Sequence, residues 1–310
     1  MKELVIISGK GGTGKTSVTA SFAVLANRPV ICDCDVDAAD LHLVLEPSIR
    51  ERHEFESGYE AIIRPADCTA CGVCAELCRF GAVKTRQNNK GSMEYFIDHV
   101  SCEGCGVCVR FCPAEAIDFP ESHCGQWFIS DTRCGPMVHA RLGIAAENSG
   151  KLVSTVRREA RQLAEKEDYK IVIVDGPPGI GCPVIASLTG ATQVLIVTEP
   201  TVSGEHDLER VLSLARHFQI PASICVNKWD INQEMTARIE EKAVARGAKI
   251  AGRICYDSAV TRAQIQQKAV VEIDAPSADD IRQLWNNLHL QEVQKKSKKE
   301  DKKIGKQENM

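Results

Sequence analysis

Residues 4–16 read LVIISGKGGTGKT, and the organisation of this 310-residue chain is best understood outward from them. A short apolar run, residues 4–7, leads into a glycine-rich segment that fits the pattern G-x-x-x-x-G-K-[ST] at residues 9–16. Between a strand and a helix, the glycines let backbone N–H groups turn towards phosphate oxygens, and the helix start adds partial positive charge. An incidental glycine-rich turn is the alternative, but the strand–loop–helix context favours a phosphate-binding loop.

Individual residues of this loop have distinct expected roles in binding a nucleotide. Lys15 should reach the β- and γ-phosphates of a bound nucleotide, and the Thr16 hydroxyl should bind Mg²⁺. Lys10 is a second lysine in the loop, for which a solvated side chain is the plain alternative. The residues expected to bind nucleotide here are Gly11, Gly12, Thr13, Gly14, Lys15, Thr16 and Ser17.

Further apolar runs alternate with segments of helical periodicity. They fall at residues 30–34, 171–174, 194–197 and 224–226, and each reads as a strand buried on both faces. Residues 150–167 carry one apolar stripe with charges elsewhere, as an amphipathic helix does. Repeated strand–helix–strand units predict an α/β fold with a mostly parallel, doubly wound sheet.

Aspartates follow two of these predicted strands. Asp33 and Asp35 come at the end of the second run, and Asp175 follows residues 171–174 directly. Carboxyl ends of parallel strands are where a doubly wound sheet presents its ligand-binding groups. An apolar strand ending in Asp is also the arrangement that supplies a Mg²⁺ carboxylate beside a phosphate-binding loop.

The alternation fails between about residues 61 and 120, where cysteines are dense. The run Cys68-x2-Cys71-x2-Cys74-x3-Cys78 is repeated 34 residues later as Cys102-x2-Cys105-x2-Cys108-x3-Cys112. This spacing is typical of ferredoxins with two iron–sulfur clusters, in which the fourth cysteine of each run ligates the other cluster. It predicts one [4Fe–4S] cluster on Cys68, Cys71, Cys74 and Cys112, and another on Cys102, Cys105, Cys108 and Cys78.

Two alternatives to iron are weaker. A secreted disulfide scaffold is unexpected in a long chain with no visible signal peptide, and structural zinc usually pairs C-x2-C units across longer spacers. Gly72 and Gly106 follow the second cysteine of each run and permit a tight path. Cys124 and Cys134 flank a hairpin predicted at residues 125–133, and a third metal or redox site there is the open alternative to two plain thiols.

The two-lysine loop, the doubled cysteine run and VDGPPGIG at residues 174–181 together resemble the MinD/ParA/Mrp superfamily of P-loop ATPases, in members with an inserted two-[4Fe–4S] ferredoxin domain. The resemblance implies that Lys10 reaches the nucleotide of a dimer partner, so that Lys10, Lys15 and Asp35 are the catalytic set. It implies that Asp33 holds a Mg²⁺-bound water beside Thr16 and Asp175, and that Asp35 orients the attacking water. It also implies that Asn227 recognises adenine, against the alternative of an asparagine capping a strand end.

The expected domains follow from these segments. Residues 1–61 and 121–290 form the P-loop ATPase domain, residues 62–120 form the inserted ferredoxin domain, and residues 291–310 form a lysine-rich, disordered tail. A net charge of −4 and an aromatic content of 5% do not favour a nucleic-acid partner. The chain offers no apolar run long enough to span a membrane, and we expect it in the cytoplasm.

The sequence leaves three functions in competition. The leading hypothesis is a slow or partner-stimulated ATPase, a homodimer or a heterodimer with a related ATPase, whose ATP and ADP states are coupled to iron–sulfur electron transfer. Its partners would be redox donor and acceptor proteins, including a metallocluster protein or its assembly machinery. The alternatives are a positioning or scaffold ATPase with structural or redox-sensing clusters, and a carrier that donates an iron–sulfur cluster.

Overall fold

The computed structural model of the chain describes residues 1–36, 39–87, 91–143 and 149–288, which form two compact units. Of the described residues, the first unit holds 1–36, 39–53, 127–141 and 149–288. The second unit holds 54–87, 91–126 and 142–143, so it spans the predicted insert and extends beyond both of its ends. The lysine-rich tail predicted at residues 291–310 lies outside the described residues.

A parallel sheet forms the centre of the first unit. Its strands follow the order β13-β12-β11-β1-β10-β2, and neighbours in this row pair in parallel. Their bounds are Lys2–Ser8 for β1, Val30–Asp33 for β2, Ile171–Pro178 for β10, Gln193–Thr198 for β11, Ala222–Asn227 for β12 and Lys249–Ile254 for β13. Residues 3–8 of β1 are all buried, because strands and helices cover this strand on every side. The predicted parallel α/β sheet is confirmed.

Three more strands extend the sheet beyond β2. Strand β9 (Pro136–Leu142) pairs in parallel with β2, and β8 (Glu121–Asp131) and then β3 (Ser48–Tyr59) follow it. The edge strand β3 carries exposed charged residues at 50–52, and charges of this kind discourage pairing with a further chain. β3 and β8 each run across the sequence boundary between the two units.

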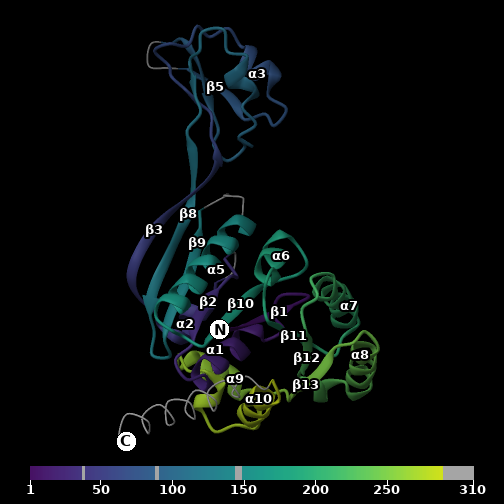
Figure 1. Cartoon of the computed structure of the whole chain (residues 1–310). Helices are drawn as coiled ribbons and strands as arrows, with labels where there is room; N and C mark the ends of the chain where they lie inside the picture. The colour runs from purple at the N-terminus through teal and green to yellow at the C-terminus, as the bar shows by residue number, and fades with distance from the viewer. Residues whose placement is uncertain (37–38, 88–90, 144–148, 289–310) are drawn as a thin grey trace, which may run out of the picture. The chain divides into compact units, whose positions relative to one another are not determined.

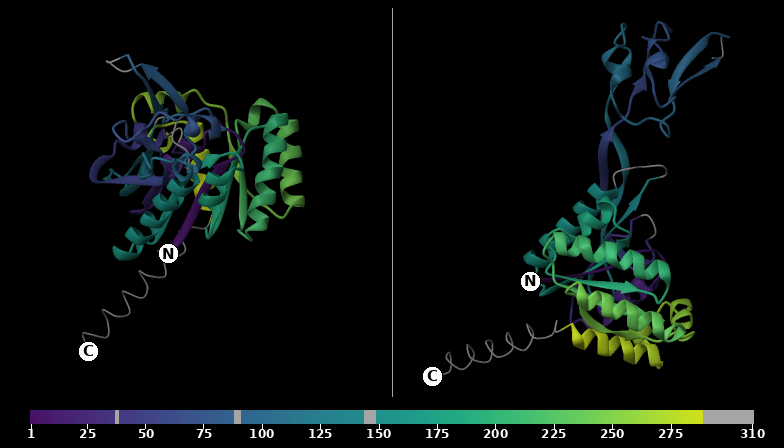
Figure 2. Two further views of the ribbon diagram at one scale, coloured as in Figure 1. Left: turned by 90° about the horizontal axis from the view of Figure 1, so that it is seen from above. Right: turned by 90° about the vertical axis from the view of Figure 1, so that its right-hand side faces the viewer.

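Helices cover both faces of the parallel sheet (Figure 1). One layer contains α5 (Ser149–Lys166), α6 (Cys182–Leu188), α7 (Val202–His217) and α8 (Gln233–Ala245), of which α7 and α8 lie side by side (Figure 2). The other layer contains α1 (Lys15–Leu25), α2 (Leu41–Leu45), α9 (Ala259–Ile265), α10 (Pro276–Asn287) and the short helix η2 (Val270–Glu272), while the short helix η1 (Trp229–Ile231) contacts α8. Phe22 and Trp285 join α1 to α10 with ring centroids 5.0 Å apart. Among the described residues, no helix is both long and apolar enough to cross a membrane.

The second unit is small and built from short elements. Strand β4 (Ile62–Ile63) pairs antiparallel with β7 (Ile117–Asp118), and β5 (Val83–Gln87) pairs antiparallel with β6 (Met93–Ile97). Two single-turn helices, α3 (Val73–Leu77) and α4 (Val107–Arg110), each begin directly after a glycine with positive φ. Its buried hydrophobic cluster is formed by Ala61, Ile63, Cys74 and Ile117.

Candidate functional site

The glycine-rich loop between β1 and α1 is an open cradle. A Cβ atom built on Gly11 or Gly12 would meet nothing within 4 Å, so space for a ligand lies directly against the backbone. Gly14 has a φ of 86°, and a Cβ there would lie 2.4 Å from the Asn227 side-chain nitrogen. Position 14 therefore requires glycine, both for its backbone conformation and for lack of room.

Lys15 begins α1 and is buried among carboxylates. Its Nζ lies 2.9 Å from Oδ1 of Asp175 and 3.2 Å from Oδ2 of Asp35, and only 6% of the side chain is exposed. Burial alone would lower the pKa of Lys15, but the two carboxylates outweigh it and raise the pKa overall. The lysine stays charged, close to the place where phosphate charge is expected.

The Asp175 carboxylate accepts hydrogen bonds from three side chains of α1. Besides Lys15, the Thr16 hydroxyl donates to Oδ2 at 2.9 Å and the Thr19 hydroxyl donates to Oδ1 at 2.8 Å. The pairing of Thr16 with Asp175 was predicted as part of a Mg²⁺ site. Thr19 was missed, although it lies one helical turn after Lys15, where its hydroxyl oxygen is also 3.0 Å from the Lys15 carbonyl oxygen.

Asp33 lies beside Asp175, because these residues are register partners on β2 and β10. Its Oδ1 accepts the Asp35 N–H at 3.1 Å, whereas its Oδ2 is buried with no hydrogen-bond partner among the described residues. Burial, followed by repulsion from Asp175, raises the pKa of Asp33 well above its usual value. Carboxylates beside the phosphate loop, one with a buried oxygen left over, suit Mg²⁺, which usually takes one or two protein carboxylates and completes its shell with waters and phosphate oxygens.

Lys10 points away from this cluster in the isolated chain. Its Nζ lies 3.2 Å from Glu199 and 3.5 Å from the hydroxyls of Thr201 and Ser203, just beyond the end of β11. Lys228 approaches the same carboxylate at 2.6 Å. Although burial opposes it, these two lysines lower the pKa of Glu199 overall. Sequence reasoning missed Glu199, since a single glutamate after a strand carries no pattern.

Asn227 uses its side chain within the protein. Its Nδ2 donates to the Thr13 carbonyl at 2.8 Å and its Oδ1 accepts the Lys228 N–H at 3.0 Å. The side chain therefore braces the phosphate loop from the end of β12. Its predicted recognition of adenine stays a prediction. Ser17 accepts a hydrogen bond from Gln264 at 3.2 Å.

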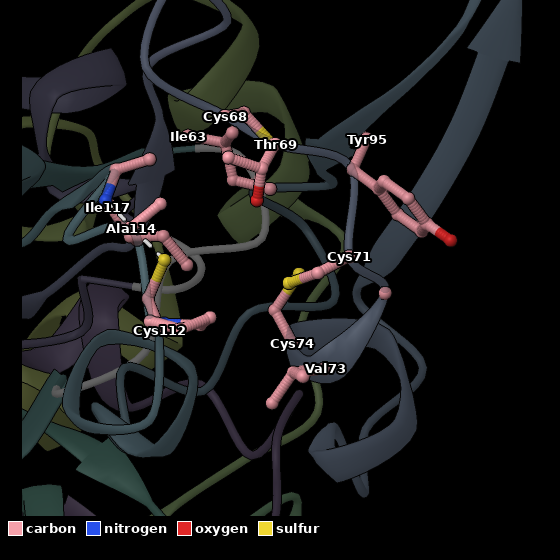
Figure 3. Close-up of a pocket in the computed structure, with 13 residues that line it drawn as sticks. Ile63, Cys68, Thr69, Cys71, Val73, Cys74, Tyr95, Cys112, Ala114 and Ile117 are labelled. Carbon is pink, nitrogen blue, oxygen red and sulfur yellow. Dashed lines mark hydrogen bonds between the residues drawn. The ribbon is translucent and has the colours of Figure 1, made fainter.

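Two cavities in the second unit gather the eight cysteines of the doubled run. The first encloses about 330 Å³, part of it open to solvent, and its lining includes Cys68, Cys71, Cys74 and Cys112 (Figure 3). The second encloses about 300 Å³, and its lining includes Cys78, Cys102, Cys105 and Cys108. The fourth cysteine of each run thus lines the cavity of the other run, which is the grouping expected from the spacing.

The backbone of each cysteine loop follows the same path. Ala70 and Gly104, at equivalent positions of the two runs, have φ of 56° and 59°, and Gly72 and Gly106 have φ of 80° and 72°. In the first run this turns the Ala70 N–H towards the Cys68 sulfur at 3.4 Å. Such amide groups directed at sulfur suit thiolate ligands.

Among the described residues, no three His, Cys, Asp or Glu side chains converge closely enough to hold one metal ion. A third site at Cys124 and Cys134 finds no support in the placement of these thiols. Cys124 lies within β8, where its Sγ donates to the Ser57 carbonyl at 3.0 Å, and Cys134 lies in the turn that precedes β9. The hairpin predicted at residues 125–133 is wrong in its bounds, because Thr132 accepts N–H groups from residues 134 and 135 and places the turn there.

Comparison with known proteins adds to this geometry. The CobQ/CobB/MinD/ParA nucleotide binding domain family matches residues 4–270. The uncharacterized protein MJ0578 of Methanocaldococcus jannaschii is 32% identical over 234 residues, which is 74% of this chain and 79% of that protein.

Solved structures share the fold. The cell division ATPase MinD of Pyrococcus furiosus aligns with a TM-score of 0.55 at 17% identity, over 93% of this chain and 98% of its own. The septum site-determining protein MinD of Pyrococcus horikoshii, complexed with Mg-ADP, aligns with a TM-score of 0.54 at 17% identity, over 93% and 95%.

Proposed function

Because the chain belongs to the CobQ/CobB/MinD/ParA nucleotide-binding domain family, we propose that it is an ATP-hydrolysing dimeric switch coupled to iron–sulfur electron transfer in its second unit. The observation that carries the ATPase part is the convergence of Lys15, Thr16, Asp33 and Asp175 below an open glycine loop. The MinD of Pyrococcus horikoshii, which shares the fold, is solved with Mg-ADP.

The loop residues divide the work of holding Mg-ATP. Backbone N–H groups around Gly11 and Gly12 face the phosphates, and Lys15 exchanges its carboxylate partners for β- and γ-phosphate oxygens. Thr16 and Asp175 would bind Mg²⁺, with Asp33 on one of its waters, and the cation would neutralise charge on the phosphate oxygens. Asp35 is left to orient the water that attacks the γ-phosphate.

Lys10 is the residue proposed to report dimer formation. In the single chain Glu199 satisfies its charge, and 32% of the side chain is exposed. Apolar side chains are also exposed in the segments that follow three strand ends: Val202, Ile231 and Tyr256 are 70%, 63% and 61% exposed. A second ATPase chain covering this edge would bury them and draw Lys10 to its nucleotide.

The two cysteine cavities support the electron-transfer part. A [4Fe–4S] cluster takes one thiolate on each of its four irons, so its ligands surround a cavity and need not meet at one ion. Four cysteines around each cavity match that requirement, and they account for the absence of a single-ion site among the described residues. Such clusters, when bound, accept and release single electrons.

Anaerobic purification followed by iron analysis and ATP hydrolysis tests this function. We expect about eight irons per chain and hydrolysis that Lys15→Ala abolishes. Lys10→Ala should keep ATP binding but lose both dimer formation in a hydrolysis-blocked analogue and most hydrolysis. Lys228→Ala removes the other partner of Glu199 and should keep dimer formation.

The coupling between the two activities needs its own measurement. We expect the reduction potentials of the clusters, or the rate of electron delivery to an acceptor protein, to differ between the ATP, ADP and nucleotide-free states. Equal values in all three states would remove the coupling. A chain without bound iron or without nucleotide affinity would remove the corresponding half of the proposal.

A further inference from the structure

Two thiols lie side by side at the end of β2, on either side of Asp33 in the sequence. Cys32 lies on β2 and Cys34 directly follows its last residue; both are free and fully buried, and their Sγ atoms are 3.5 Å apart. Side chains alternate along a strand, so this pair lies on one face of the sheet and Asp33 lies on the other. Helix α5 packs against β2. Asp33 is close enough to Lys15 of α1 for the lysine charge to act on its carboxylate.

A bond between these thiols would change the shape of the strand. The Cα atoms of residues i and i+2 of a strand are about 6.6 Å apart, near the upper limit of about 6.8 Å for a disulfide, and their Cβ atoms project in parallel at a similar spacing. A disulfide needs those Cβ atoms within about 4.5 Å and its sulfurs about 2 Å apart. The backbone at Asp33 would therefore have to buckle. The Cys34 N–H donates to the Asp175 carbonyl at 2.8 Å, so the buckling would also disturb Asp175.

We propose that Cys32 and Cys34 are a reversible disulfide site, oxidised by low-molecular-weight disulfides, and that the bond switches off the Mg-ATP site. The proposal rests on the proposed ATPase function for its effect but not for its chemistry. A disulfide forced into a strand is strained and readily reduced, which makes the modification reversible.

The reaction consists of two thiol–disulfide exchanges. The Cys34 thiolate attacks one sulfur of an external disulfide and forms a mixed disulfide, and one external thiol leaves. The Cys32 thiolate then attacks the Cys34 sulfur and releases the second external thiol. The two cysteines lose two protons and two electrons, and the external disulfide gains them as two thiols.

Because both thiols are buried, the exchange depends on an opening of the structure around them. A small disulfide cannot reach thiols with no exposed surface, so exchange proceeds from a state in which the end of β2 has opened. Mg-ATP would bind to Thr16, Asp33 and Asp175 around the end of β2, and would therefore favour the state in which this end has not opened. Bound nucleotide should therefore protect the thiols from oxidation.

The full-length protein can be tested anaerobically in buffers with graded ratios of oxidised to reduced glutathione. The segment between Lys15 and Arg50 contains no other cysteine, so mass spectrometry after alkylation reads this pair alone. We expect that peptide to lose two hydrogens and ATP hydrolysis to fall about tenfold, equivalent to about 1.4 kcal/mol. A hydrolysis-blocked ATP analogue should slow the loss, and reduced glutathione should reverse it.

Two variants separate this site from the other thiols. Cys32→Ala should hydrolyse ATP equally with and without oxidised glutathione, while Cys225→Ala, which lacks a buried strand thiol elsewhere in the sheet, should respond as the wild type does. The proposal is overturned if both sulfurs are alkylated at every ratio, if the bond forms without loss of hydrolysis, or if Cys32→Ala is equally inhibited. Absence of hydrolysis in the reduced wild type contradicts the ATPase function instead, and the peptide mapping still tests the disulfide.

Discussion

At the scale of single residues, the two cysteine loops differ at one position that should matter for iron. A Cβ added at Gly104 would lie 2.2 Å from the Tyr59 carbonyl oxygen, whereas the equivalent Ala70 already carries one in the same conformation. Gly104→Ala should displace the second loop and reduce bound iron from about eight to about four per chain. Ala70→Gly is the matched variant and should keep all the iron. Equal iron contents in both variants would contradict this account.

His139 gives the first unit a pH dependence. Burial lowers its pKa to about 4 from an ordinary 6.5, and Ser130 contacts its Nε2 at 2.8 Å. A depressed folded-state pKa stabilises the fold fully above pH 6.5, and this contribution is lost as pH falls from 6.5 through about 4. The full shift is equivalent to about 3 kcal/mol, which partial exposure of the ring reduces to about half.

Denaturant unfolding at pH 7 and pH 5 measures this effect. The wild type should lose more stability between these values than His139→Gln, which keeps a polar partner for Ser130. His217→Gln, at an exposed position on α7, should lose as much stability between pH 7 and pH 5 as the wild type does. A wild type and a His139→Gln variant with the same pH profile would rule the contribution out.

The sequence predicts site residues where a pattern surrounds them. Lys15 and Asp175 were predictable because the loop motif and the strand ends bring them to one edge of the sheet, and the structure places their atoms 2.9 Å apart. Glu199 and Thr19 were not predictable, because their roles come from neighbours that only the folded chain supplies. The chemical roles themselves, including those of Lys10 and Asn227, remain predictions.

At the scale of elements, a buried ion pair fixes the helix layer that contains α5 and α6. Arg157 of α5 bonds Glu3 of β1 and also donates to the carbonyls of Ala186 and Thr189 at the end of α6. Arg161 contacts the same glutamate at 2.6 Å. The pair therefore connects the central strand to α6, the helix that follows the VDGPPGIG motif at residues 174–181.

Removing Arg157 should be costly for that reason. Arg157→Leu leaves Glu3 buried with part of its charge uncompensated and leaves two helix carbonyls without a donor, so we expect a loss of about 3 kcal/mol. Arg158→Leu, one position along and 61% exposed, should change the free energy of unfolding by less than about 0.5 kcal/mol. Urea unfolding of both variants measures the difference, and comparable losses would show that burial of the pair is not the cause.

Strands were predictable from the sequence only where both of their faces are buried along their length. The central parallel strands read as continuous apolar runs because both of their faces are covered. Strands β3 and β8 were missed, because neither is a continuous apolar run along its length. One face of β3 is exposed and carries charges, and β3 is the edge strand of the sheet among the described residues, whereas β8 mixes polar and apolar residues. The pairing of β9 with β2 and of β3 with β8 joins segments remote in sequence, which periodicity cannot identify.

At the scale of the whole molecule, the two compact units should differ in what holds them together. The first has an extensive apolar core, whereas the buried core of the second is limited to a few residues around its cysteines. Units this small generally need metal or disulfide cross-links, and here all the cysteines are free thiols. Removal of iron should therefore unfold the second unit alone.

Hydrogen exchange before and after anaerobic iron chelation tests that expectation. Amides of residues 61–118 should lose protection, while those of the central strands and the affinity for nucleotide should persist. Protection retained in both units would show that the second unit is stable without metal, and loss in both would show that the units unfold together.

The position of β1 in the sheet also has a consequence for biosynthesis. In the part of the chain that the structure describes, this first strand pairs with β10 on one side and β11 on the other, and Thr16 contacts Asp175 across 159 positions of chain. During translation, β1 has no strand to pair with on either side until β10 and β11 have left the ribosome, when more than half of the polypeptide has been made. A high contact order of this kind slows folding, and it makes the nascent N-terminal segment a natural client for chaperones.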